Sequence, residues 1–128
     1  MSRKSKGINA ERELIHLFWK NNWAAVRIAG SGSMKYPSAD VLATNKIRRL
    51  AIECKTSRED CKYFTLEGIK QLRSFADMFN SEPWIGMRFD RLGWLFISLD
   101  DIETKKNSHS VSKELAKNKG LNFEEIIR

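Results

Sequence analysis

Apolar residues recur at helical spacing in two stretches of the chain. In the first, Leu14 and Ile15 precede Phe18 by four and three positions, which predicts a helix over residues 9–21. Asn9 is a favourable N-cap for this helix. The second stretch predicts a helix that ends near residue 80, ahead of Pro83. Its apolar face consists of Leu66, Ile69, Leu72, Ala76 and Phe79.

Five other stretches show alternation, β-branched residues or short apolar runs, and each predicts a strand. They are residues 23–29, 39–44, 50–56, 84–89 and 94–99. Polar turns at residues 45–48 and 90–93 predict that the neighbouring strands pair as hairpins. A short strand near Val111 and a short helix from Asn122 are expected beyond them. This order predicts a single α/β domain over residues 1–128, with a central mixed five-stranded sheet flanked by helices.

The net charge of the chain favours a polyanionic partner. Lys and Arg together number 23 and Asp and Glu 16, which gives a net charge of +7 and a pI near 9.6. Such a balance is typical of nucleic-acid-binding proteins, although solubility alone is an alternative explanation. Residues 1–7 predict a flexible basic arm, in which Arg3, Lys4 and Lys6 suit contacts to phosphate.

The sequence gives no sign of a membrane segment or a zinc site. No apolar run approaches the roughly 20 residues that a membrane-spanning helix needs. The basic start lacks the apolar core of a signal peptide, so a cytoplasmic protein without a membrane partner is expected. Cys54 and Cys61 show no disulfide framework, and with two isolated histidines they are too few for a zinc site.

A carboxylate and an ammonium group lie side by side on the third predicted strand. Glu53 and Lys55 are two positions apart, so their side chains project from one face of the strand while Cys54 points to the other. Burying such a pair costs free energy unless the two groups serve each other or a metal ion. A strand-end salt bridge is the alternative, because Glu-x-Lys also occurs by chance in many chains.

Two further acids are predicted to approach this pair. A hairpin about residues 46–47 pairs positions whose numbers sum to about 93, so Asp40 is expected opposite Glu53. Glu11 lies on the same helical face as the apolar residues and is predicted to face the sheet. Each acid alone has a simpler explanation, since Asp40 suits a strand start and Glu11 suits a helix N-terminus.

Together, these acids and the lysine are typical of a metal-dependent phosphodiesterase. Hard cations such as Mg²⁺ take oxygen ligands and leave room for phosphate oxygens. Asp40 and Glu53 are the predicted metal ligands, and Glu11 would hold a water or help to bind a second ion. Lys55 would orient the attacking water or neutralise developing charge.

The arrangement resembles the PD-(D/E)xK nuclease superfamily, with Asp40 and the run Glu53-Cys54-Lys55 as its signature. The proline is displaced, because Pro37-Ser38-Ala39-Asp40 stands in place of an adjacent Pro-Asp. Within the superfamily, the chain resembles the archaeal-type Holliday junction resolvases, which also occur in viruses. Further matching segments are Arg3-Lys4-Ser5-Lys6-Gly7, Ala10-Glu11-Arg12-Glu13-Leu14, Ala25-Val26-Arg27, Ser31-Gly32-Ser33, Gly93-Trp94-Leu95-Phe96-Ile97 and Gly120-Leu121-Asn122-Phe123-Glu124-Glu125.

The resemblance implies a restriction-endonuclease-like fold and a homodimer with two active sites on one basic face. Each site would cut one strand of a four-way DNA junction and leave a 5′-phosphate. It implies dependence on Mg²⁺, with Mn²⁺ as a substitute, and an active-site serine that matches Ser31, with Ser33 as the alternative. The expected catalytic set is Glu11, Asp40, Glu53, Lys55 and Ser31. The expected DNA-binding set is Arg3, Lys4, Lys6, Arg12, Arg27, Ser33 and Lys35.

Two other functions are compatible with the same residues. One is a nuclease of the superfamily that acts on ordinary duplex DNA, and the other is a DNA-binding protein without catalytic activity. The small size of the chain favours recognition of DNA shape, because no additional domain is available to read sequence.

Overall fold

The computed structural model describes residues 2–30 and 35–128 and has a five-stranded sheet at its centre. The strands are β1 (Ala24–Arg27), β2 (Val41–Thr44), β3 (Arg49–Ser57), β5 (Glu82–Phe89) and β6 (Gly93–Ser98). Their spatial order is β1-β2-β3-β5-β6, with β3 and β5 parallel and the other neighbours antiparallel. The predicted mixed five-stranded sheet is therefore confirmed.

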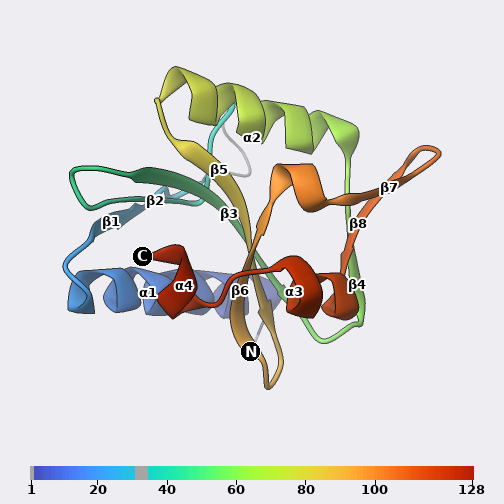
Figure 1. Cartoon of the computed structure of the whole chain (residues 1–128), viewed down its shortest axis with the longest axis horizontal. Coiled ribbons are helices and arrows are strands. Elements are labelled where there is room, and N and C mark those ends of the chain that lie inside the picture. The colour runs from blue at the N-terminus through green and yellow to red at the C-terminus, as the bar shows by residue number, and fades with distance from the viewer. Residues whose placement is uncertain (1, 31–34) are drawn as a thin grey trace.

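Helices cover both faces of this sheet. They are α1 (Arg3–Lys20), α2 (Leu66–Met78) and, near the C-terminus, α3 (Lys113–Lys119) and α4 (Phe123–Ile126). Figure 1 shows α1 and α2 on opposite sides of the sheet. Leu14 and Phe18 of α1 are buried in one hydrophobic cluster, and Leu72 and Ala76 of α2 are buried in another. None of the helices in the described part of the chain has the length and apolarity needed to cross a membrane.

The predicted flexible arm is wrong for residues 3–7, which form the start of α1. Ser2 is the N-cap, and its side chain accepts a hydrogen bond from the backbone N–H of Ser5 at 3.1 Å. Lys6 also lies 3.6 Å from Asp90, which ties this first part of the helix to the β5–β6 turn. The predicted cap Asn9 is consequently inside the helix. Capping by a serine and a tertiary contact outweigh the weak helix propensity of Gly7.

A second, three-stranded sheet was not predicted from the sequence. It consists of β4 (Cys61–Phe64), β7 (Glu103–Lys105) and β8 (Ser108–Ser112) in the order β4-β8-β7. β4 lies between the third predicted strand and the second predicted helix, where no strand was predicted, and β7 has no buried residue that could mark it as a strand. Only the strand near Val111 was expected. The helix from Asn122 is confirmed, and a capping box with Glu125 explains its start.

The predicted register of the β2–β3 hairpin is confirmed. Val41 pairs with Ile52, so the paired numbers sum to 93. Asp40 lies directly before β2 and continues the ladder, because its backbone N–H donates to the Ile52 carbonyl at 2.9 Å. This pairing brings Asp40 beside Glu53, as the hairpin geometry requires.

Candidate active site

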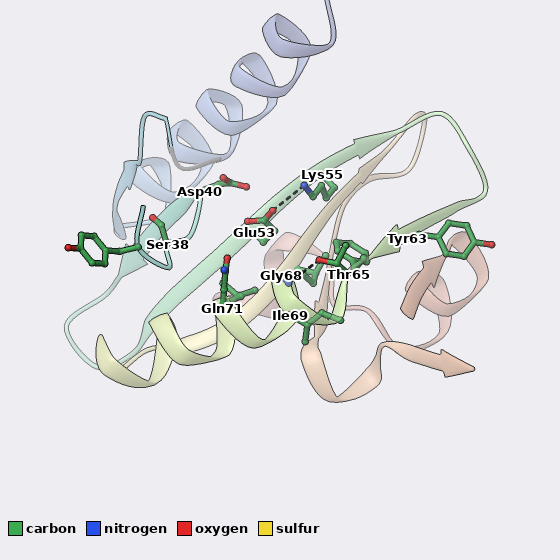
Figure 2. A pocket seen from close by; sticks show the side chains of 13 residues that line it. Ser38, Asp40, Glu53, Lys55, Tyr63, Thr65, Gly68, Ile69 and Gln71 are labelled. Carbon is green, nitrogen blue, oxygen red and sulfur yellow. Dashed lines mark hydrogen bonds and ion pairs between the residues drawn. The ribbon is translucent and has the colours of Figure 1, made fainter. Parts of the chain in front are cut away.

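Asp40, Glu53 and Lys55 line one pocket of about 330 Å³ between β3, α2 and the segment that precedes β2. Figure 2 shows the three side chains converging there, with Lys55 directed at Glu53. The Lys55 Nζ lies 3.1 Å from a Glu53 carboxylate oxygen. Cys54, between them, packs against the hydrophobic cluster on the α1 side of the sheet. Strand alternation therefore places Glu53 and Lys55 together in this pocket and directs Cys54 to the opposite face of the sheet.

Asp40 is held in place by the neighbouring strand. One oxygen of its carboxylate accepts a hydrogen bond from the backbone N–H of Cys54 at 2.8 Å. A side-chain hydrogen bond also links Asp40 and Glu53 and raises the pKa of Glu53. The carboxyl groups of Asp40 and Glu53 thus lie against each other at the end of the hairpin. The hydrogen bond from the Cys54 backbone fixes the position of Asp40.

Burial is the main cause of the raised pKa of Glu53, and the negative charge of Asp40 adds to it. Burial alone would lower the pKa of Lys55, but the adjacent carboxylates outweigh this and the net pKa is raised. Lys55 is therefore protonated at neutral pH, and its positive charge partly compensates the two acids. The site concentrates more negative charge than one lysine can neutralise.

Glu11 approaches the same acids from α1. Its side chain is only 16% exposed and lies 3.6 Å from the Arg27 guanidinium. Burial and the charge of Asp40 raise the pKa of Glu11 to about 7, although Arg27 opposes the shift. The expectation that Glu11 faces the sheet is met, but Glu11 does not line the pocket that holds the other three residues.

The donor set fits a hard divalent cation. In residues 2–30 and 35–128, no three acidic, histidine or cysteine side chains surround a common point. Glu53 is paired with Lys55, and Glu11 is paired with Arg27. Burial raises the pKa values of Glu11 and Glu53, and repulsion from Asp40 adds to both shifts. A divalent cation would stabilise the charged form of these acids. Asp40 and Glu53 supply adjacent carboxylate oxygens, the ligand type that Mg²⁺ prefers.

The predicted DNA-binding residues divide into four groups. Arg3 and Lys6 line a second groove of about 550 Å³, which Lys55 also borders. Lys4, Arg12 and Lys35 are exposed outside this groove, whereas Arg27 is paired with Glu11. Ser31 and Ser33 lie outside the described residues.

Several pocket residues were not predicted from the sequence. They are Tyr36, Ser38, Tyr63, Thr65 and Gln71. Figure 2 shows Gln71 projecting from α2 towards the space between Asp40 and Glu53. The helix and the strand are far apart in the sequence, and their meeting depends on how α2 packs on the sheet. No local pattern therefore marks Tyr63, Thr65 or Gln71 as neighbours of the acids, whereas Tyr36 and Ser38 are close to Asp40 in the sequence.

We expect Glu11→Gln to stabilise the metal-free protein at pH 8. The pKa of Glu11 is about 7 in the fold and near 4.5 in an unfolded chain, so the stability that protonation confers is present below pH 4.5 and lost as pH rises through 7. The gain in unfolding free energy at pH 8 should be about 1–2 kcal/mol after allowance for solvent screening. Urea unfolding in EDTA measures it.

The control for this prediction is Glu13→Gln, two residues further along α1. A hydrogen bond from Arg88 at 2.8 Å lowers the pKa of Glu13, so its replacement should destabilise the protein at pH 8. Near pH 4, wild type and Glu11→Gln should unfold at the same urea concentration. A loss of stability in Glu11→Gln at pH 8 would show that Glu11 is a structural ion-pair partner of Arg27.

Comparison with known proteins places this geometry in context. Residues 2–128 match the family model described as archaeal Holliday junction resolvase (Hjc). The crossover junction endodeoxyribonuclease Hjc of Archaeoglobus fulgidus is 38% identical over 105 residues, which cover 81% of this chain and 77% of that protein. The crossover junction endodeoxyribonuclease Hjc of Methanocaldococcus jannaschii is 32% identical over 122 residues, which cover 95% of this chain and 86% of that protein.

A solved structure shares the fold. The structure of Archaeoglobus fulgidus Hjc, described as a Holliday junction resolvase from an archaeal hyperthermophile, superimposes with a TM-score of 0.88 at 30% sequence identity. The match covers 95% of this chain and 100% of that one. The central mixed sheet and its flanking helices therefore occur in both proteins.

Proposed function

The chain belongs to the archaeal Holliday junction resolvase family, and on that premise we propose that it cuts four-way DNA junctions by Mg²⁺-dependent phosphodiester hydrolysis. The observation that carries the proposal is the convergence of Asp40, Glu53 and Lys55 in one open pocket of a strongly basic protein. Crossover junction endodeoxyribonuclease is also the activity named for its relatives.

Asp40 and Glu53 are the proposed ligands of the divalent cation, with Mn²⁺ as a substitute for Mg²⁺. When bound, the cation supplies Lewis acidity and neutralises charge on the phosphate. The hydrogen bond from the Cys54 N–H keeps Asp40 oriented for this task without a rearrangement of the strand. Glu11 would hold a water beside the ligands, since it interacts with the charges of both Asp40 and Glu53.

Lys55 is the proposed group that holds the attacking water or a phosphate oxygen. Its ammonium group, raised in pKa by Glu53 and Asp40, remains a hydrogen-bond donor at neutral pH. The water attacks the phosphorus and gives up a proton, the bond between phosphorus and the 3′ oxygen breaks, and that oxygen takes up a proton to become a 3′ hydroxyl. The phosphate stays on the 5′ end. An active-site serine, Ser31 or Ser33, remains part of the proposal.

The groove beside the pocket is the proposed path of the DNA backbone. It is lined by Arg3, Lys6, Lys55, Arg58 and Lys62, so one catalytic residue belongs to both cavities. Contacts of lysine and arginine with phosphates supply affinity without sequence readout. Lys4, Arg12 and Lys35 would add further positive charge around this path, and Arg27 would act through Glu11.

Paired cuts across a junction need two active sites, and we propose a homodimer. The C-terminal end of α2 exposes two large apolar residues, Met78 at 88% and Phe79 at 50%. Phe79 also borders an apolar groove of about 200 Å³ over β1 and β2, which includes Val26 and Leu42. An apolar surface of this kind, next to a stacked Phe75–Phe79 pair, is suited to contact a second subunit.

Phe79→Asp should convert the dimer to a monomer, because a buried, unpaired carboxylate at the interface opposes association. Light scattering at micromolar protein measures the mass, and circular dichroism checks the fold. Ile47→Asp is the control, since Ile47 is 86% exposed in the β2–β3 turn. A wild type that is monomeric, or a Phe79→Asp variant that remains dimeric, would contradict this interface.

The function itself is tested by comparing cleavage of a four-way junction with cleavage of its linear duplex arms. With Mg²⁺, we expect the junction to be cut at least about ten-fold faster, as recognition of DNA shape requires. Equal rates would identify a duplex nuclease, and binding without any cleavage would identify a non-catalytic protein. An enzyme acting on cellular or viral DNA would work in the cytoplasm, as the sequence predicts.

A further inference from the structure

Two exposed tyrosines border the pocket that holds the acids. Tyr36 and Tyr63 both line it, and each is 69% exposed. Most of each ring surface therefore contributes nothing to the hydrophobic core. Large aromatic side chains that remain exposed beside a functional pocket are more typical of binding than of folding.

The two rings come from separate elements on different sides of the acids. Tyr36 belongs to the segment that leads to Asp40, whereas Tyr63 lies on β4. In Figure 2, Ser38, two residues after Tyr36, and Tyr63 lie on opposite sides of Glu53. Both tyrosines line the pocket from these different elements, and the Tyr63 ring is turned outward, away from Glu53 (Figure 2). DNA whose phosphate is held at Glu53 would therefore pass a tyrosine as it leaves the pocket.

Positive charge accompanies both rings. Lys35 Nζ lies 5.9 Å from the centre of the Tyr36 ring. Lys62 precedes Tyr63 on β4 and lines the adjoining basic groove. The combination of a basic groove and aromatic rings is the one by which proteins bind unpaired nucleotides, with the backbone on the charges and the bases on the rings.

Ordinary duplex DNA offers no base faces to such rings, because each base pair is stacked between its neighbours. Base faces become available where stacking is interrupted, as at a branch point. We propose that Tyr36 and Tyr63 stack on bases that flank the cut phosphate at the branch point and thereby favour junctions over duplex. This inference rests on the proposed function and adds a recognition role for two residues to it.

The test uses 2-aminopurine, a fluorescent base that is quenched by stacking, next to the branch point of a four-way junction. A second junction carries the same base in the middle of one arm. Binding is followed in EDTA with wild type, Tyr36→Leu, Tyr63→Leu and the matched variants Tyr36→Phe and Tyr63→Phe. The Phe variants keep the ring and the Leu variants remove it.

Each Leu variant should bind the junction about ten-fold more weakly, the typical loss for one stacked base, while its affinity for duplex stays the same. Wild type and the Phe variants should change the fluorescence of a probe on either side of the cut phosphate. Each Leu variant should lose the change on one side and keep it on the other. Neither set should affect the probe in the arm.

Leu variants that alter the branch-point fluorescence as wild type does, or that lose junction and duplex affinity equally, would overturn the stacking role and leave the proposed function intact. A wild type that binds junction and duplex alike would overturn both. The wild-type measurement alone thus separates the two failures.

Discussion

Asp40→Asn should lower the rate of junction cleavage by at least about a thousand-fold. When a metal ligand loses its negative charge, a metal-dependent site loses several kcal/mol of transition-state stabilisation. Junction binding should change by less than about three-fold, since Asp40 lies in the pocket and the phosphate-binding charges lie along the groove. Single-turnover cleavage and a gel-shift titration in EDTA measure the two quantities.

The fold should tolerate this substitution. The Asn side chain has the same shape, and its carbonyl oxygen can still accept the hydrogen bond that the Cys54 N–H gives to Asp40. Asp77→Asn, on the exposed face of α2, is the matched control and should cleave at the wild-type rate. Normal cleavage by Asp40→Asn with Mg²⁺ would remove Asp40 from the active site.

Lys55→Met should separate chemistry from metal binding. We expect turnover to fall about a hundred-fold or more, because the group that positions the water or stabilises charge is lost. Affinity for Mn²⁺ should be retained or increased, since Lys55 lies 3.1 Å from Glu53 and competes with a cation for its oxygens. Titration of Mn²⁺ by electron paramagnetic resonance, together with single-turnover kinetics, distinguishes the two effects.

The Lys55→Met experiment has a clear alternative outcome. Lys117→Met, on the exposed side of α3, controls for the loss of one positive charge and should leave both quantities unchanged. A Lys55→Met variant with normal turnover would mean that the lysine only forms a salt bridge with Glu53. A variant that loses Mn²⁺ binding would mean that Lys55 orients a ligand rather than the water.

The central part of the site was predictable because it depends on local geometry. Strand alternation is enough to place Glu53 and Lys55 on one face, and the turn length is enough to place Asp40 opposite Glu53. The register of β2 and β3 agrees with that prediction. Helical periodicity also directed Glu11 to the sheet, although α1 covers the face opposite α2 and Glu11 reaches the acids from that side.

The remaining features depend on contacts between distant segments. Gln71 and Tyr63 reach the pocket only because α2 and β4 pack beside β3, and no spacing in the sequence encodes that distance. The same limit applies to β7, whose residues are exposed and pair with β8 without contributing to the core. The helical start at Arg3 was missed because the basic residues 1–7 were interpreted as a flexible arm and Asn9 as the N-cap, whereas Ser2 caps the helix.

The location of a bound Mn²⁺ ion tests the central claim most directly. Anomalous X-ray diffraction from crystals soaked in Mn²⁺ identifies the ion without reference to activity. We expect a peak between the carboxylates of Asp40 and Glu53, and its loss in the Asp40→Asn variant. A peak that lies elsewhere, or one that survives unchanged in Asp40→Asn, would contradict the assignment of this pocket as the metal-dependent active site.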